Sequence, residues 1–469
     1  MESMASTPQR YPASLAPQLR SSSDAEAQTL RRALLYGSRI LVVMAGYPGE
    51  PVRRDYFARA RELGVELVLV ESARHMAAAE ELISAREVES AIAVDLGSDA
   101  PSRRRLLEVV RRNGPFHGVW TFVEFGLPLT AWLARELGLP GNPVDVVELG
   151  RDKERMRQRA RDVGLSTPRF CRIRNEADLI VAQAKVGFPA IFKPVAGLTS
   201  IEVHLVRDSA ELLAKYRAVT ERMRRADHGN PEMLAAIREQ GCEFILEEFL
   251  EGREFDVDFV LSDGECVYAA VTDNIGHPTW PFVLANANMP AELSHADSRQ
   301  LIETAVDSTF RLGYREGVFH VELKWKNDAS PALLEINARV GGASQYQLNR
   351  AVWGVDLIEE QLLSCVGIPN RPCVASAPLR SFATQYLLAP RTGIVVEGDY
   401  LREVKASLPT DAVLVCEPWA TVGSLVQGPE RGPPDWIGEI TVAGTNLEEA
   451  RSALAHALSQ VDYSFIRSA

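Results

Sequence analysis

The chain changes partway along its length from one kind of strand arrangement to another. Short apolar runs at 39–45, 65–70, 91–95 and 118–123 alternate with stretches of helical periodicity. This alternation predicts a doubly wound parallel sheet with helices on both faces and with ligands at the carboxyl ends of its strands. From residue 244 onward, apolar runs follow one another through turns and predict antiparallel hairpins. The chain therefore must hold more than one domain.

Length and composition exclude several classes of protein. The 469 residues are enough for about three ordinary domains. A net charge of -12 argues against a nucleic acid or an anionic membrane as partner, because both need a positive surface. The six cysteines include no CxxC pair, so neither a disulfide framework nor a zinc site is expected, and we expect a cytoplasmic location. No apolar run approaches the ~20 residues that span a bilayer.

The first 34 residues are rich in serine, alanine and proline and contain no long apolar run. This composition predicts a disordered tail or leader. A transit peptide is an alternative, whereas a secretory signal is not, because the apolar segment of such a signal is missing.

Acidic and amide side chains gather on one predicted β-hairpin. Runs at 318–323 and 332–338 flank a turn and are expected to pair. Glu335, Asn337 and Arg339 alternate along the second strand and share a face, and the pairing can bring Glu322 beside them. Carboxylate and amide oxygens suit Mg²⁺, and Arg339 can then hold an anion. For the hairpin alone, a solvated acidic face is the alternative.

Lysine is rare, which directs attention to the places where it occurs. Only seven lysines stand among 51 basic residues. Lys193 ends an apolar strand directly before a loop of small residues that includes Thr199 and Ser200. The ammonium group and the loop N–H groups suit phosphate oxygens. A lysine that only reaches solvent is the alternative.

A second acidic stretch suits a nucleoside. Glu247, Glu248, Phe249 and Leu250 end a strand and offer a backbone edge and a carboxylate to an adenine ring. Glu254 follows and could accept hydrogen bonds from both ribose hydroxyls, because an ionised carboxylate is only an acceptor. Acidic pairs on an ordinary surface strand are the alternative.

The order of these segments resembles the ATP-grasp superfamily from about residue 35 to residue 465. Within it, EFDVDFVLSDGE, VTDNIGHP, FHVELK and LLEINARVGG resemble the L-amino-acid ligase and carnosine-synthase-like carboxylate–amine ligases. The C-terminal AGTNLEEARSALAHAL is similar to the closing domain of those ligases and of biotin carboxylase. The resemblance implies a mixed α/β and α+β fold of ATP-grasp architecture. Such a fold has an N-terminal doubly wound parallel-sheet domain, a mobile α+β lid and a C-terminal antiparallel-sheet domain.

The resemblance also implies domain bounds and residue roles. The expected units are a tail (1–34), an N-terminal α/β domain (35–150), a lid (151–245), a large subdomain with the metal site (246–375) and a closing domain (376–469). Lys153, Lys193 and Ser200 would contact ATP phosphates, Glu247 to Leu250 would hold adenine, and Glu254 would hold ribose. Glu322, Glu335 and Asn337 would bind Mg²⁺, for which Mn²⁺ is a substitute, and Arg339 and Lys193 would be catalytic. Glu202 departs from the glycine of many members, which puts the flap contacts in doubt.

The implied reaction joins a carboxylate to an amine through an acyl phosphate, with amino acids as expected substrates and a dipeptide as product. Residues 272–290 form the expected substrate loop, with Asn274, His277 and Trp280 as candidate contacts. Gly341 and Gly342 would allow close approach of a small acyl group.

Three other functions remain open at this stage. A biotin-carboxylase-like enzyme or a purine-pathway carboxylate ligase would share the ATP site, although no carrier-lysine segment such as Met-Lys-Met occurs. From another class, a nucleotide-binding regulatory module would bind ATP without ligation. A homodimer is compatible with any of these functions.

Overall fold

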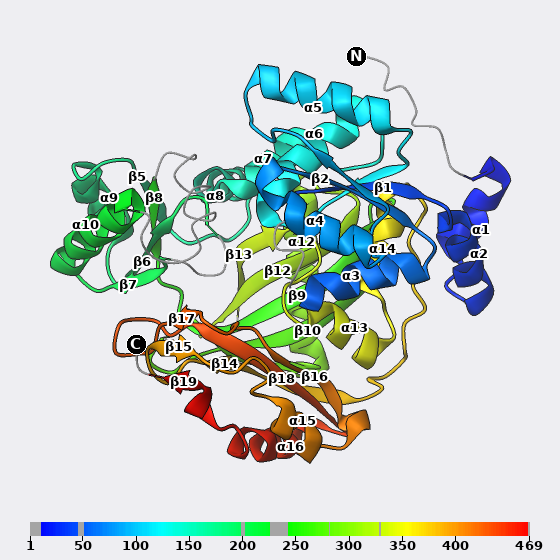
Figure 1. Cartoon of the computed structure of the whole chain (residues 1–469). Coiled ribbons are helices and arrows are strands. Elements are labelled where there is room, and N and C mark those ends of the chain that lie inside the picture. Colours follow the sequence, from blue (N-terminus) through cyan, green and yellow to red (C-terminus); the bar gives the residue numbers. More distant parts are fainter. Residues whose placement is uncertain are drawn as a thin grey trace.

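The strands of the protein form four sheets in the part of the chain that the structure describes. The computed structural model describes residues 11–45, 51–197, 202–225, 243–280, 282–327 and 330–467. A parallel sheet, a lid sheet, a large antiparallel sheet and a short C-terminal sheet contain four, four, eight and three strands, respectively. Figure 1 shows the lid sheet set off to one side of the other units. Among the described helices, none combines the length and the apolar content that a membrane crossing requires.

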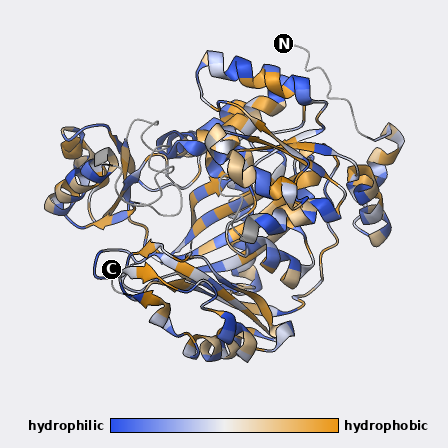
Figure 2. Ribbon diagram, in the orientation of Figure 1, coloured by the Kyte–Doolittle hydropathy of each residue, from blue (hydrophilic) through white to orange (hydrophobic). Residues whose placement is uncertain are grey.

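The N-terminal unit confirms the predicted parallel sheet. Its strand order is β3-β2-β1-β4, with parallel pairing throughout. The strands are β1 (Arg39–Val43), β2 (Glu66–Glu71), β3 (Ser90–Ala93) and β4 (Gly118–Trp120), and the helices are α3 (Pro51–Glu62), α4 (Met76–Ser84), α5 (Ala100–Asn113) and α6 (Leu127–Leu137). The strands are largely apolar, whereas the helices carry both polar and apolar residues (Figure 2), as expected for a sheet covered on both faces.

Residues 11–34 correct the predicted disordered tail. They contain α1 (Ala16–Ser21) and most of α2 (Ala25–Leu35), and Leu19 and Ala27 are fully buried. Asp24 caps α2, and the buried Arg31 Nε donates to the carbonyl oxygen of Pro369 at 3.0 Å. Composition alone predicted disorder wrongly for two reasons. The buried residues of α2 lie on one helical face, and Arg31 bonds to a residue far along the chain. Residues 1–10 lie outside the described part.

Two helices meet at Asp152, before the first strand of the lid sheet. They are α7 (Val144–Arg151) and α8 (Lys153–Asp162). The Asp152 carboxylate accepts the N–H of Arg155 at 3.0 Å and so caps α8. Lys153 is therefore the first residue of a capped helix.

The lid sheet has a core of its own, in the region predicted to be the lid. Its strand order is β5-β8-β6-β7. The strands are β5 (Phe170–Ile173), β6 (Ala190–Pro194), β7 (His204–Val206) and β8 (Phe244–Glu248), and the helices are α9 (Asp178–Val186) and α10 (Ser209–Arg225). Phe192, Val219 and Phe244 belong to a cluster of buried side chains drawn from these elements. The bounds and the mobility of the lid remain predictions.

The large antiparallel sheet joins the predicted metal-site hairpin to the C-terminal part of the chain. Its order is β13-β12-β9-β10-β11-β14-β18-β16. The strands are β9 (Gly252–Ser262), β10 (Glu265–Gly276), β11 (Leu284–Met289), β12 (Gly317–Lys326), β13 (Pro331–Asn337), β14 (Ser381–Leu388), β16 (Val413–Pro418) and β18 (Trp436–Gly444). Helix α12 (His295–Leu312) packs on one face, and α13 (Gln345–Trp353) and α14 (Leu357–Cys365) pack on the other.

The segment predicted to be a substrate loop, 272–290, is mostly strand, which corrects that prediction. Its first residues continue β10 to Gly276 and its last residues form β11, so 277–283 alone connects the two. Pro281 lies outside the described residues. Asparagine usually marks turns, but here Asn274 and Asn288 donate to carboxylates on the sheet.

The remaining elements cover the C-terminal end of the large sheet. They are β15 (Gly393–Val395), β17 (Leu425–Val426) and β19 (Ile466–Arg467), which form the short sheet, and helices α15 (Arg402–Ser407) and α16 (Leu447–Ser459). Short 3-10 turns are η1 (Ala13–Leu15), η2 (Ala73–His75), η3 (Glu124–Gly126), η4 (Thr410–Ala412) and η5 (Tyr463–Phe465).

Candidate active site

The predicted hairpin brings its two carboxylates face to face. In the pairing of β12 with β13, Glu322 lies opposite Glu335 and His320 lies opposite Asn337. Residues directly opposite in an antiparallel pair share a face. The sequence prediction that Glu322 joins Glu335 and Asn337 is therefore confirmed as geometry, while the role of these residues in metal binding remains a proposal.

The two carboxylates differ in their electrostatic surroundings. Desolvation, then the nearby charges of Glu335 and Asp256, raises the pKa of Glu322 well above its usual range. Burial also works against ionisation of Glu335, but Lys153 and Lys193 outweigh it and lower its pKa. The nearby His320 favours the ionised form of Glu322 but does not outweigh burial and the neighbouring acids. A pair of adjacent carboxylates, one of them only partly compensated by positive charge, fits a divalent cation, which prefers oxygen ligands.

Both predicted phosphate lysines lie inside the protein next to carboxylates. Lys153 Nζ donates to Glu335 Oε1 at 3.0 Å and lies 3.5 Å from the carbonyl oxygen of Gly197. Lys193 Nζ lies 2.5 Å from Glu247 Oε2. Ser200 lies outside the described residues, so its predicted phosphate contact stays a prediction.

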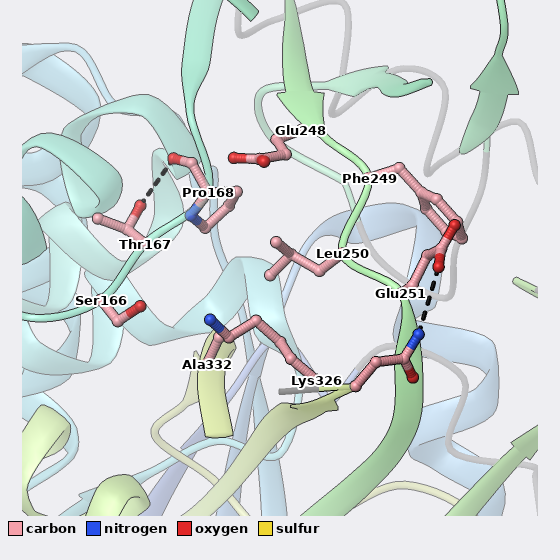
Figure 3. Close-up of a pocket in the computed structure, with 10 residues that line it drawn as sticks. Ser166, Thr167, Pro168, Glu248, Phe249, Leu250, Glu251, Lys326 and Ala332 are labelled. Carbon is pink, nitrogen blue, oxygen red and sulfur yellow. Dashed lines mark hydrogen bonds between the residues drawn. The ribbon is translucent and has the colours of Figure 1, made fainter. Parts of the chain in front are cut away.

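The predicted adenine stretch lines a pocket of about 410 Å³ (Figure 3). Glu248, Phe249 and Leu250 form one wall. The other lining residues are Ser166, Thr167, Pro168, Glu251, Lys326, Asn327 and Ala332. Lys326 and Ala332 belong to β12 and β13, the same hairpin that carries Glu322 and Glu335. This hairpin therefore connects the pocket to the carboxylate pair.

Glu247, in this stretch, and Glu254, which follows it, both pair with basic side chains of the protein. Glu247 accepts from Arg157 Nε at 2.8 Å as well as from Lys193. Although burial opposes its ionisation, these two cations lower the pKa of Glu247 to about 2. Glu254 Oε2 accepts from Lys324 Nζ at 3.0 Å. Neither acid lines the pocket, so their predicted contacts with adenine and ribose remain predictions.

Arg339 is held by a residue that the sequence reasoning missed. Arg339 Nε donates to Glu124 Oε2 at 2.6 Å, and Arg151 Nη1 donates to Glu124 Oε1 at 2.7 Å. Glu124 begins η3, a few residues after β4 ends at Trp120. The rule that ligands gather at the carboxyl ends of parallel strands could have indicated it.

Of the predicted substrate residues, Asn274 lies beside another candidate site residue, whereas His277 contacts its own loop. Asn274 lies opposite Glu254 on the sheet and donates to Asp256 at 3.1 Å. His277 Nδ1 accepts the backbone N–H groups of Thr279 (3.2 Å) and Trp280 (3.3 Å), so this nitrogen stabilises its own loop.

The two glycines after Arg339 differ from each other. A Cβ on Gly341 would lie 2.8 Å from Nδ1 of His320, so a larger residue would not fit there. A Cβ on Gly342 would meet nothing within 4 Å. Gly341 is thus packed tightly against protein atoms, and the predicted approach of an acyl group to the two glycines stays a prediction.

Comparison with known proteins agrees with this arrangement. A model of the ATP-grasp domain matches residues 186–346, and a model of the ATP-grasp N-terminal domain matches residues 57–141. Carnosine synthase 1 from Homo sapiens is 30% identical over 362 residues, which cover 74% of this chain and 42% of that protein. Alanine–anticapsin ligase from Bacillus subtilis is 26% identical over 275 residues, which cover 56% of this chain and 57% of that protein. The chain thus spans less than two thirds of the length of these curated relatives.

A solved structure shares the fold over nearly the whole chain. The crystal structure of an L-amino acid ligase from Bacillus licheniformis has a TM-score of 0.76 at 22% identity, covering 92% of this chain and 99% of that chain. The matched domains lie in the same order as the parallel-sheet unit, the lid sheet and the hairpin of Glu322 and Glu335. The chain therefore carries an ATP-grasp N-terminal domain followed by an ATP-grasp domain, and belongs to the ATP-grasp superfamily.

Proposed function

We propose that this protein is an ATP- and magnesium-dependent ligase that joins the carboxylate of one amino acid to the amine of another. The observation that carries the proposal is the pairing of Glu322 with Glu335 on a hairpin that also lines the pocket beside Glu248 and Leu250. Two relatives are named as a carnosine synthase and an alanine–anticapsin ligase, which supports amino acids as substrates.

The nucleotide would lie between the lid sheet and the large sheet. Its base would occupy the pocket beside Glu248 to Leu250, and its phosphates would extend toward Lys153 and Lys193. Glu322, Glu335 and Asn337 would hold magnesium. Bound there, the ion would neutralise charge on the phosphate oxygens.

The reaction would proceed in two steps. A substrate carboxylate oxygen attacks the γ-phosphate, which forms an acyl phosphate and releases ADP. The amine then attacks the acyl carbon, the C–N bond forms, and phosphate and a proton leave. Arg339 would hold the carboxylate and afterwards stabilise the oxyanion, and the lid would exclude water that hydrolyses the acyl phosphate.

A substrate panel tests the proposal. The full chain is incubated with ATP, Mg²⁺ and pairs of amino acids, and ADP, phosphate and peptide are measured in the same reaction. We expect phosphate release that needs two amino acids and equals the amount of dipeptide. Dependence on bicarbonate would identify a carboxylase-like enzyme, and dependence on a purine-precursor substrate would identify a purine-pathway ligase. ATP binding without turnover under every condition would identify a regulatory module.

A further inference from the structure

Glu124 reaches the candidate active site from a different unit of the protein. It begins η3, which follows β4 in the parallel-sheet unit, whereas Asn337 is the last residue of β13 in the large sheet and Arg339 follows two residues later. Its side chain is 5% exposed. A buried carboxylate is costly unless it is paired and hydrogen-bonded, so its partners indicate why it is there.

Both oxygens of Glu124 are engaged by arginines. Oε2 accepts from Arg339 Nε at 2.6 Å and Oε1 accepts from Arg151 Nη1 at 2.7 Å. Short, charge-assisted bonds of this kind hold a guanidinium in a defined orientation. Arg339 Nη1 also donates to the carbonyl oxygen of Val340 at 2.9 Å, so the guanidinium is held at two of its nitrogens.

The same carboxylate determines which way the Asn337 amide points. With its nitrogen toward Glu124, the amide donates to Oε2 at 3.0 Å and to Oε1 at 3.3 Å. The opposite orientation would place the amide oxygen against carboxylate oxygens, and both are acceptors. Glu124 therefore selects one orientation, in which the Asn337 oxygen points away from Glu124.

This orientation matters for the proposed metal site. Asn337 follows Glu335 by two positions on β13, so the two side chains share a face. Only the amide oxygen can bind Mg²⁺, because the amide nitrogen has no free electron pair for the metal. An Asn337 amide that rotated freely would present oxygen to the cation for only part of the time.

We propose that Glu124 is a positioning residue, which directs the amide oxygen of Asn337 toward a divalent cation and holds the guanidinium of Arg339 for the substrate carboxylate. This inference rests on the proposed function, because it takes Asn337 as a metal ligand and Arg339 as the carboxylate holder. If Glu124 served only to join the two units, an ion pair with a single arginine would be enough. Glu124 instead contacts the side chain of Asn337, which ends β13, and that of Arg339, two residues further along the chain.

Glu124→Gln tests the metal part of the proposal. The substitution keeps the size of the side chain but removes its charge, and it allows the Asn337 amide to take either orientation. Mn²⁺ binding is measured by electron paramagnetic resonance of the free ion, in the presence of a non-hydrolysable ATP analogue. We expect affinity to fall by about 10-fold or more, as for other residues that orient metal ligands. Glu71→Gln is the matched control, because Glu71 is a buried glutamate of the same unit that pairs with His75.

A double variant distinguishes the loss of the Asn337 amide orientation from a general loss of structure. In the double variant Glu124→Gln with Asn337→Asp, the carboxylate at position 337 presents an oxygen to the metal in either orientation, and the new amide at position 124 can donate to it. We expect Mn²⁺ affinity to return to within about threefold of the wild type, because two contacting residues are coupled. The KM for the carboxylate substrate should stay raised in both variants, since Arg339 has lost its charged partner.

The outcomes distinguish this inference from the proposed function. A wild-type chain that does not bind Mn²⁺ with nucleotide would overturn the metal role itself. Wild-type binding together with unchanged affinity in Glu124→Gln would overturn the positioning role alone. If Glu124→Gln does not fold, Glu124→Asp keeps the charge but shortens the reach. Its Mn²⁺ affinity should still fall, and an unchanged value would also overturn the inference.

Discussion

Lys193 and Glu247 form an ion pair inside the lid sheet, with Nζ 2.5 Å from Oε2. The two residues lie on the neighbouring strands β6 and β8. Glu247 Oε1 also accepts from Arg157 Nε, and Arg157 Nη2 donates to the carbonyl oxygen of Leu334 at 2.7 Å. One buried carboxylate therefore balances two cations and, through Arg157, connects the lid sheet to β13.

Glu247→Gln should destabilise the protein strongly. The substitution leaves Lys193 and Arg157 buried without the carboxylate that both contact, and breaking a buried pair in this way costs about 3–5 kcal/mol. The free energy of unfolding is measured by urea titration of the full chain. Glu248→Gln is the matched control, because the adjacent Glu248 pairs with Arg169 near the surface and its loss should cost less than about 1 kcal/mol. Equal losses in the two variants would contradict this account of Glu247.

Glu335→Ala should abolish metal-dependent turnover. The change removes one of the two facing carboxylates and also deprives Lys153 of the oxygen it contacts at 3.0 Å. The loss of ATP turnover should exceed the roughly 10- to 100-fold effect of changes next to a metal ligand. Initial rates are measured over a range of Mg²⁺ concentrations. Glu265→Ala is the control, because Glu265 is the first residue of β10 and is not part of the proposed metal site. Turnover that survives in Glu335→Ala would show that Glu335 is not a metal ligand.

Arg339→Ala should separate ATP binding from ligation. Arg339 contacts Glu124 and is not among the residues that line the proposed nucleotide pocket, so affinity for an ATP analogue should stay near that of the wild type. If Arg339 stabilises the developing oxyanion as proposed, its loss should lower kcat for the dipeptide by at least about 100-fold. Calorimetry of nucleotide binding and a peptide assay measure the two effects. Arg451→Ala, which removes a surface arginine of α16, is the control; normal ligation in Arg339→Ala would exclude the proposed role.

The hairpin of Glu322 and Glu335 could be predicted because its information is local. Glu335 and Asn337 follow the two-residue period of a strand, and the turn that precedes them brings Glu322 to the opposite position. The parallel sheet was predictable for the same reason, since each of its strands is a separate apolar run. Local periodicity therefore accounts for the side chains that one element, or one hairpin, places together.

The partners of these side chains could not be predicted, because they depend on how distant elements pack. Glu124 contacts Arg339 across 215 positions of sequence, and Arg31 contacts Pro369 across 338. Neither contact leaves a periodic pattern. The pairing of Glu247 with Arg157 is similar, because an acidic strand end looks the same in sequence whether it faces adenine or a buried guanidinium.

Glu202, beside the predicted flap, stands where many ATP-grasp proteins have glycine. Its backbone has a φ of 56°, in the left-handed region that glycine adopts without strain. Its carboxylate accepts from Arg222 Nη2 at 2.6 Å and contacts His204 Nε2 at 2.7 Å. The side chain is therefore turned onto α10 and β7, where its contacts offset the cost of a non-glycine residue.

Glu202→Gln should destabilise the protein in a pH-dependent way. Burial opposes ionisation, yet His204 and Arg222 lower the pKa of Glu202 from 4.5 to about 2. Because the folded pKa lies below the unfolded value, the stabilisation is fully present above pH 4.5 and is lost as the pH falls toward 2. The variant should lose up to about 3 kcal/mol at pH 7, and its difference from the wild type should shrink at lower pH. Urea unfolding at a series of pH values measures this difference. Glu176→Gln, which breaks an exposed lid pair with Arg217, should show a smaller effect, and a Glu202→Gln difference that stays constant with pH would contradict the ion-pair explanation.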